Sequence, residues 1–234
     1  MAKLLTPEQL DALRRLSTCA AANAIETFGT RLRNEGFTKS GIVPFFPRLR
    51  PMLGYAVTLK IRSSSPPPIG PNYLERTEWW NEILKIPQPR IIVVEDVDPQ
   101  PGTGALFGEV HANILKALGC VGLATNGAVR DLPAMEALGL HVFASKVAVS
   151  HSYVHLIEMG TPVEIAGLEI HPGDLLHGDC HGILSIPPEH AVEIPRVAAG
   201  MIEREKKLIA LCQKQDVAID ELRSAIQDLR GETS

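Results

Sequence analysis

The sequence lacks a long apolar run, an excess of basic side chains and a substantial aromatic content. No uninterrupted apolar stretch approaches the roughly 18 residues that a membrane-spanning helix needs, so no such helix is expected. With 23 Lys and Arg against 27 Asp and Glu, a net charge of −4, the chain has no basic stripe for nucleic-acid phosphates. Aromatic residues make up 5% of the chain, too few for a platform that stacks single-stranded bases. We therefore expect neither a membrane nor a nucleic-acid partner.

Cysteine is also sparse. The four cysteines lie far apart and form no CxxC pair: Cys19, Cys120, Cys180 and Cys212. This spacing favours neither a disulfide framework nor a zinc knuckle, and it predicts small buried residues in a reducing compartment. Residues 1–16 carry acidic and amide side chains where a signal peptide has an apolar run. The expected location is the cytoplasm.

The remaining composition is that of an ordinary globular protein. The 234 residues, 45% of them hydrophobic, are enough to bury a proper core. No linker marks a second domain, so residues 1–234 are predicted to form one domain with N-terminal helices and a C-terminal helical tail.

Local patterns predict the order of helices and strands. Thr6, Pro7 and Gln9 form a capping-box pattern for a helix that runs toward residue 16. Ser17 or Thr18 can cap a second helix that ends before Gly29. Further along, the patterns predict strands at 54–60, 90–95 and 121–125, and helices at 72–85, 107–118 and 132–138.

This alternation of strands and helices predicts a parallel sheet. After residue 141, short segments broken by Gly and Pro favour an antiparallel cap, and the chain becomes helical again from residue 188. The expected fold is an α/β layered sandwich with a mostly parallel central sheet flanked by helices and a C-terminal helical extension.

Two predicted strand-to-helix junctions carry chemistry. In open α/β sheets, ligands bind where strands end and helix N-termini present free N–H groups. The first junction is GTGALFGEVH at 102–111, and the second is TNGAVRD at 125–131. Together they offer backbone amides and the Arg130 guanidinium to an anion, and the carboxylates of Glu109 and Asp131 to a divalent cation. Glycine-rich loops and Arg-Asp helix starts are also common without a ligand, and spacing alone leaves both interpretations open.

These residues resemble a known signature. Twenty residues separate Glu109 from the Arg130-Asp131 pair, and this arrangement resembles the acidic-X20-Arg-Asp signature of the 4-hydroxy-4-methyl-2-oxoglutarate aldolases in the RraA-like family. The segments LSTCAAANAIETFG at 16–29 and HPGDLLHGDCHGILSIP at 171–187 are also similar to that family. The resemblance extends over roughly residues 17–207.

The resemblance implies a role for each matching position. The backbone amides of residues 108–111 would hold the carboxylate of a pyruvate-like substrate, and these residues are Gly108, Glu109, Val110 and His111. Arg130 would contact the 2-keto oxygen, and Asp131 would bind Mg²⁺ or Mn²⁺ directly. Glu109 stands where characterised aldolases usually have Asp, and it would reach the metal through water.

The resemblance also implies assembly. In the family, a glutamate from the C-terminal helix of a neighbouring subunit approaches the metal, and here Glu203 or Glu205 could match it. Homotrimers or homohexamers with active sites between subunits are therefore expected.

The implied activity is retro-aldol cleavage of a 4-hydroxy-2-oxo acid to pyruvate, with Arg130, Asp131 and Glu109 as catalytic residues. Loss of carbon dioxide from oxaloacetate forms the same enolate and is expected as a side activity. The alternative is a non-catalytic regulator of the RraA type that binds a ribonuclease or helicase; such regulators lack the acidic residue at position 109. A third alternative is the same site acting on another keto acid.

Other candidate chemistries are weaker. His151 and His155 have the i, i+4 spacing of helical metal ligands but lie in a β-branched stretch, where residues so spaced do not share a helical face. His171, His177 and His181 alternate with glycines, and a surface or interface position is expected for them. No lysine shows a reason for a lowered pKa that Schiff-base chemistry would need. GxGxxG and P-loop patterns are missing from the sequence.

Overall fold

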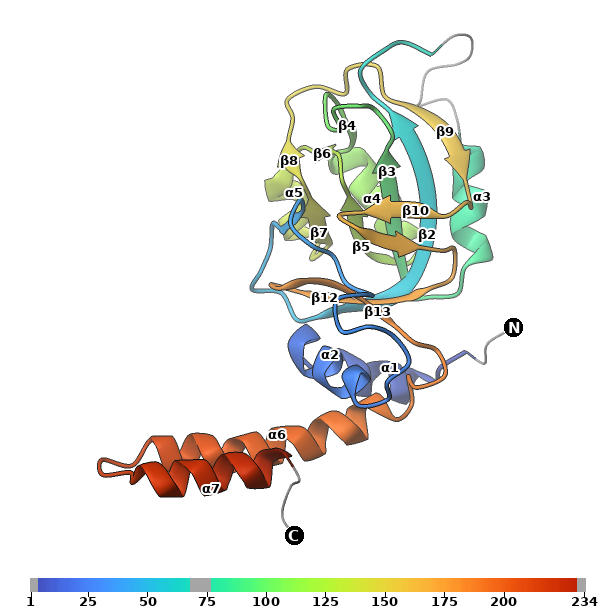
Figure 1. The fold of residues 1–234 in the computed structure, drawn as a ribbon. Coiled ribbons are helices and arrows are strands. Elements are labelled where there is room, and N and C mark those ends of the chain that lie inside the picture. Colours follow the sequence, from blue (N-terminus) through green and yellow to red (C-terminus); the bar gives the residue numbers. More distant parts are fainter. Residues whose placement is uncertain (1–3, 68–76, 231–234) are drawn as a thin grey trace.

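The computed structural model describes residues 4–67 and 77–230 of the chain. An α/β body lies at one end of the molecule, and a helical hairpin projects from it (Figure 1). The hairpin consists of α6 (Ile194–Cys212) and α7 (Ile219–Arg230), which confirms the predicted C-terminal helical extension. Within the described ranges, no helix is both long and apolar enough to cross a membrane.

The main sheet is mixed. Its strand order is β1-β7-β5-β3-β2-β12-β13, and β9 also pairs with β2. The central strands β2, β3, β5 and β7 run parallel, whereas β1, β9, β12 and β13 are antiparallel to their neighbours. The bounds are β1 (Val43–Pro44), β2 (Met52–Arg62), β3 (Arg90–Asp96), β5 (Cys120–Thr125), β7 (His141–Ala144), β9 (His155–Met159), β12 (Leu175–Asp179) and β13 (Gly182–Ile186).

The prediction of a mostly parallel sandwich is therefore wrong. Strand β2 is 11 residues long and curves through the body (Figure 1). Along one edge it pairs first with β12, at Tyr55 opposite Leu175, and then with β9, at Leu59 opposite Met159. The connections after residue 147 are too short for crossover helices, so β9, β12 and β13 return antiparallel and join the main sheet. Residues 163–170 form a separate antiparallel hairpin, so the predicted antiparallel cap is confirmed in part.

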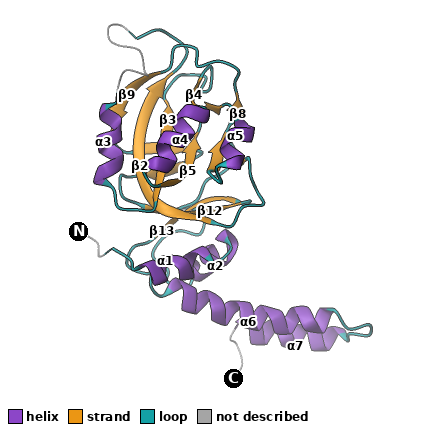
Figure 2. Cartoon of the chain, turned by 180° about the vertical axis from the view of Figure 1, so that it is seen from behind, coloured by secondary structure: helices purple, strands orange, loops and turns teal. Residues whose placement is uncertain are grey.

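The helices of the body cover one face of this sheet. Figure 2 shows α3 (Glu78–Lys85), α4 (Glu109–Ala117) and α5 (Leu132–Ala137) on that face. Trp79, Leu115 and Met135 from these helices are buried in one hydrophobic cluster with the sheet. The opposite face is covered by the hairpin of β10 (Val163–Ile165) and β11 (Leu168–Ile170), whose apolar side chains are buried against it. The sheet is thus not flanked by helices on both faces as predicted.

The predicted N-terminal helices are confirmed as α1 (Pro7–Arg14) and α2 (Thr18–Glu26). The Thr6 hydroxyl accepts a hydrogen bond from the Gln9 amide and the Gln9 side chain accepts one from Thr6, which completes the capping box. Ser17 is the N-cap of α2. The helix predicted at 72–85 begins at Glu78, and the earlier part of that range lies outside the described residues.

Three short parallel strands form a second sheet beside the helices. They are β4 (Ala105–Phe107), β6 (Ala128–Val129) and β8 (Lys146–Val147). Strand β4 leads into α4, and β6 leads into α5. Because the carboxyl ends of neighbouring parallel strands meet at one edge of a sheet, the two predicted junctions lie side by side.

Candidate functional site

Gly108 links β4 to α4 and sits against the second junction. It is the N-cap of α4, and Glu109 is the first residue of the helix. A Cβ atom at position 108 would lie 2.5 Å from Asp131 Oδ2 and 3.1 Å from Arg130 Cγ. Glycine at this position therefore allows the Arg-Asp pair to approach the helix N-terminus.

Asp131 bridges the two junctions. It is the N-cap of α5 with a left-handed backbone, φ 55°, and its Oδ2 accepts a hydrogen bond of 3.0 Å from the Glu109 amide. That bond, together with the charges of Arg130 and His151, holds the pKa of the Asp131 carboxyl below its usual range. Asp131 is consequently ionised at neutral pH.

Arg130 lies beside this carboxylate. Its amide donates to the Phe107 carbonyl oxygen at 3.0 Å, which pins the second junction to the end of β4. The Arg130 Nε atom lies 3.4 Å from an Asp131 carboxylate oxygen. The exposed fractions of the two side chains are 30% and 36%, so both are held by the protein and open to a ligand.

The predicted carboxylate-binding amides belong to the first turn of α4, but they are not equivalent. The Glu109 amide already donates to Asp131. The Glu109 and Val110 side chains are exposed, so Glu109 presents its carboxylate to solvent beside the junction. The first-turn amides of a helix remain the expected anion-binding groups of this element.

His111 faces the core. Its ring packs against both Trp79 and Phe107, at centroid distances of 5.9 Å and 6.1 Å. Burial, helped by the nearby charge of His151, lowers the pKa of His111 to about 4. Its imidazole is therefore neutral at pH 7 and packs in the aromatic cluster behind the site.

Sequence reasoning missed His151 as a site residue. Its Nδ1 atom donates to the Ala105 carbonyl oxygen at 2.6 Å, and its charge acts on the pKa of Asp131. The prediction that His151 and His155 do not share a helical face is confirmed, because His155 belongs to β9 and pairs with Arg62 of β2. The position of His151 depends on the loop after β8, for which the local sequence carries no signal.

A buried polar network fixes the loops that lead to the site. The Asn126 side chain accepts from the Asp96 amide at 2.7 Å and donates to the Asp96 carbonyl oxygen at 3.0 Å. Asp96 Oδ2 accepts from the Gly102 amide at 2.8 Å. The end of β3 thereby anchors the loop before β4 and the turn before β6.

Glu203 and Glu205 lie elsewhere in the chain. Both belong to α6, which projects from the end of the body opposite β4 and β6 (Figure 1). Glu203 pairs with Lys206 at 2.7 Å. One chain does not bring these glutamates to Asp131, and their contribution from a neighbouring subunit stays a prediction.

The donors at the junction fit a hard divalent cation. The Asp131 carboxylate is ionised and partly exposed, and the Glu109 carboxylate is exposed on the adjoining helix turn. Carboxylate oxygens are the donors that Mg²⁺ prefers. The Arg130 guanidinium supplies a positive charge for an anion bound beside such a cation.

Fold and site thus define an α/β protein whose strand-to-helix junctions combine a helix N-terminus, an arginine and carboxylates. Residues 18–185 match the RraA-like family, described as Aldolase/RraA. The match includes more than half of the chain, and the protein belongs to this family.

The chain is also similar to individual proteins. The chain is 27% identical over 173 residues to the uncharacterized protein MJ0644 of Methanocaldococcus jannaschii, covering 72% of this chain and 76% of that protein. It is 34% identical over 86 residues to a Halalkalibacterium halodurans protein named "Putative 4-hydroxy-4-methyl-2-oxoglutarate aldolase", covering 36% of this chain and 41% of that protein.

A solved structure shares the fold. RraAS2 of Streptomyces coelicolor, described as an unusual member of the RNase ES inhibitor RraA protein family, superposes with a TM-score of 0.68 at 22% identity. The superposition covers 87% of this chain and 96% of that chain.

Proposed function

We propose that the protein is a divalent-metal-dependent lyase that cleaves a 4-hydroxy-2-oxo acid of the 4-hydroxy-4-methyl-2-oxoglutarate type to pyruvate. Oxaloacetate decarboxylation is the proposed side activity. The observation that carries the proposal is the convergence of Arg130, ionised Asp131 and the N-terminus of α4 at one edge of the β4-β6-β8 sheet. The named aldolase relative supports the same reaction class.

Each group at the junction has a role in this chemistry. The first-turn amides of α4 bind the substrate carboxylate, and Arg130 donates to the 2-keto oxygen. The C4 hydroxyl gives its proton to a base from solvent, C4 becomes the carbonyl carbon of the departing product, and the electron pair of the broken C3–C4 bond moves into the enolate of pyruvate. A proton from water then adds to C3 and completes pyruvate. Because the negative charge collects on the oxygen beside Arg130, the guanidinium binds this enolate more strongly than the ground state.

Asp131, with Glu109 beside it, would hold Mg²⁺ or Mn²⁺. When bound, the cation supplies Lewis-acid stabilisation of negative charge on the substrate oxygens. The Glu109 amide holds Asp131 at the N-terminus of α4, and the low pKa of Asp131 keeps it charged across the neutral range.

A coupled pyruvate assay tests the proposal. The purified chain with Mg²⁺ or Mn²⁺ is assayed on 4-hydroxy-4-methyl-2-oxoglutarate and oxaloacetate, with and without a chelator. We expect turnover that the chelator abolishes and that Asp131→Asn reduces by at least about a hundredfold, whereas the exposed Asp216→Asn leaves it unchanged. Absence of turnover on both substrates would contradict the lyase, and turnover that survives chelation would contradict the metal dependence.

The alternative function is a regulator that binds a ribonuclease or helicase. Its support is the fold shared with RraAS2, which is described as a member of an RNase ES inhibitor family. We favour the lyase because Glu109 retains the acidic residue that such regulators lack. Addition of the chain to a purified ribonuclease of the RNase E type separates the two: inhibition without aldolase turnover would favour the regulator.

A further inference from the structure

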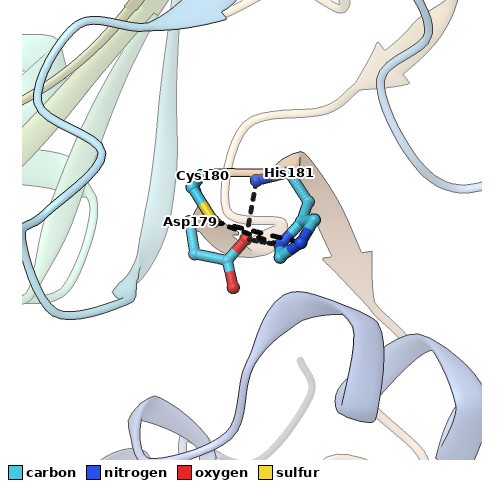
Figure 3. A group of neighbouring side chains, drawn as sticks. All are labelled: Asp179, Cys180 and His181. Carbon is cyan, nitrogen blue, oxygen red and sulfur yellow. Dashed lines mark hydrogen bonds and ion pairs between the residues drawn. The ribbon is translucent and has the colours of Figure 1, made fainter.

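A second cluster of metal-binding residue types lies in the tight turn between β12 and β13. Cys180 and His181 form the turn, and Asp179 is the last residue of β12 (Figure 3). One ligand atom from each residue lies within 4.8 Å of the others. The turn lies beside α2, at a different end of the body from the β4-β6-β8 sheet (Figure 1).

The spacing of these atoms suits a tetrahedral ion. Zinc bonds of about 2.3 Å to sulfur and about 2.0 Å to nitrogen, at a tetrahedral angle, separate the two ligand atoms by about 3.5 Å. The Cys180 Sγ and His181 Nδ1 atoms are 3.4 Å apart. The Asp179 Oδ1 and His181 Nδ1 atoms are 2.9 Å apart, so an ion would replace this hydrogen bond after a small outward shift of the ring.

The carboxylate of the cluster is already held in place. Asp179 Oδ2 accepts from the Thr18 amide at 2.8 Å and Oδ1 accepts from the His181 amide at 2.9 Å. Burial raises the pKa of Asp179, but these hydrogen bonds more than offset it and leave the pKa below its usual range. Cys180 and His181 are exposed, so an ion can reach the cluster from solvent.

A second cysteine approaches from another element. Cys19 is the second residue of α2, the helix whose first residue, Thr18, is bonded to Asp179. The Thr18 amide bond to Asp179 places the next residue, Cys19, beside the turn. The Cys19 thiol is not among the ligand atoms that lie within 4.8 Å of one another, so it would reach a bound ion only after a rotation of its side chain. The two thiols come from positions 161 residues apart in the chain, so local sequence spacing does not indicate their proximity.

We propose that Asp179, Cys180 and His181 form a metal site that takes Zn²⁺ in preference to Mg²⁺ or Mn²⁺, and that the Cys19 thiol completes it after a rotation of its side chain. Thiolate and imidazole ligands suit zinc, whereas magnesium and manganese prefer oxygen. Each bound thiol gives its proton to solvent, so binding tightens as the pH rises. A bound ion would tie the β12–β13 turn to α2. The site is independent of the lyase proposed above.

Cobalt is the probe for this site, because Co²⁺ replaces Zn²⁺ and absorbs intensely in the near ultraviolet when bound to thiolate. The full chain is stripped of metal with a chelator, kept reduced and titrated with Co²⁺. We expect thiolate-to-cobalt absorption that saturates near one equivalent and disappears when Zn²⁺ is added. The same titration of the Asp131→Ala variant, which lacks the carboxylate proposed to bind metal at the lyase site, should give the same thiolate-to-cobalt absorption.

Cysteine and histidine variants assign the ligands. Cys180→Ser should abolish the absorption, and Cys19→Ser and His181→Ala should each weaken Zn²⁺ binding at least tenfold in a competition assay. The exposed Cys212→Ser on α6 is the matched control and should bind like the wild type. A wild-type chain without thiolate-to-cobalt absorption overturns the proposal, as does absorption that persists in Cys180→Ser. Wild-type Zn²⁺ affinity in Cys19→Ser would remove Cys19 from the ligand set.

Discussion

Arg130 is the residue on which the proposed chemistry depends most directly. Its amide is bonded to β4 and its guanidinium is next to Asp131, so the charge is fixed before a substrate binds. A preorganised charge of this kind contributes to catalysis because no reorganisation is needed as the enolate forms. Its planar fork also matches a keto acid better than an ammonium group does.

We therefore expect Arg130→Ala to reduce kcat/KM for pyruvate formation by about a hundredfold to a thousandfold. Arg130→Lys retains the positive charge but lacks the planar guanidinium, so its kcat/KM should fall by about tenfold or more. The coupled assay measures both variants, with Arg223→Ala on α7 as an exposed arginine control. Equal activity of wild type and Arg130→Ala would show that this guanidinium does not contact the reacting oxygen.

Gly108 makes a steric prediction at the same site. An added methyl group would overlap Asp131 Oδ2, 2.5 Å away, and would push the carboxylate off the α4 N-terminus. Gly108→Ala should weaken Mn²⁺ binding and lower turnover by at least about tenfold, since a displacement of about 1 Å near reacting groups is costly.

The matched control is Gly200→Ala in α6, where a Cβ meets no atom within 4 Å and alanine favours the helix. Manganese affinity can be followed by its paramagnetic effect on water relaxation, independently of turnover. Unchanged affinity in Gly108→Ala would mean that Asp131 is not a metal ligand.

At the level of elements, the network of Asp96 and Asn126 sets the spacing of the two junctions. Asn126→Ala removes both side-chain bonds and leaves the buried Asp96 amide and carbonyl groups without these partners. We expect a loss of about 2 kcal/mol in the free energy of unfolding, measured by urea denaturation, together with reduced turnover. Asn23→Ala on the exposed face of α2 should change the free energy by less than about 0.5 kcal/mol. Similar small losses in both variants would contradict the anchoring role.

The predictable elements are those encoded by local pattern. The caps at Thr6 and Ser17 and the apolar run of β3 were identifiable because capping and burial act over a few residues. The pairing of β2 with β12 could not be identified from the sequence, because the partners are about 120 residues apart. The direction in which β12 runs depends on the whole sheet. Helices on both faces were expected, but β10 and β11 form the second layer instead.

The site divides in the same way. Glu109, Arg130 and Asp131 could be proposed from motif spacing, and the structure places their junctions together. His151 could not be proposed, because its contact with Ala105 depends on tertiary pairing of the loop after β8 with β4, which includes the bond from the Ala105 amide to the Ser150 carbonyl oxygen. Three cysteines expected to be buried are exposed, and only Cys120 is buried. Cysteine burial depends on the tertiary arrangement, which the spacing of four residues does not determine.

For the whole molecule, the main asymmetry is between the body and the α6–α7 hairpin (Figure 1). The hairpin exposes Ile209, Ile219 and Ile226 and carries Glu203 and Glu205. Such a projecting element is consistent with the expected trimer or hexamer, in which it would lie on another subunit. The body, in contrast, contains within a single chain the buried His111 and His177 and the partly buried His141.

These histidines predict how stability changes in acid. Burial lowers the pKa of His111 and of His141 to about 4, and it also lowers the pKa of His177. The unfolded chain keeps the ordinary value of about 6.5. Between these values the unfolded state binds more protons, so the free energy of unfolding falls as the pH falls. The ionised carboxylates with lowered pKa contribute little there, because their stabilisation is lost only below about pH 4.

Urea denaturation of the metal-free chain at pH 7 and pH 5 measures this effect. For each histidine whose pKa is lowered to about 4, proton linkage predicts that the free energy of unfolding falls by about 2 kcal/mol between pH 7 and pH 5. The variant His141→Gln retains a polar side chain at the start of β7 but cannot take up a proton. Its free energy of unfolding should therefore fall by about 2 kcal/mol less than that of the wild type between the two pH values. If wild type and variant lost the same free energy, His141 would not be held neutral by the fold. If neither lost any, burial of charge would not limit the stability of this protein in mild acid.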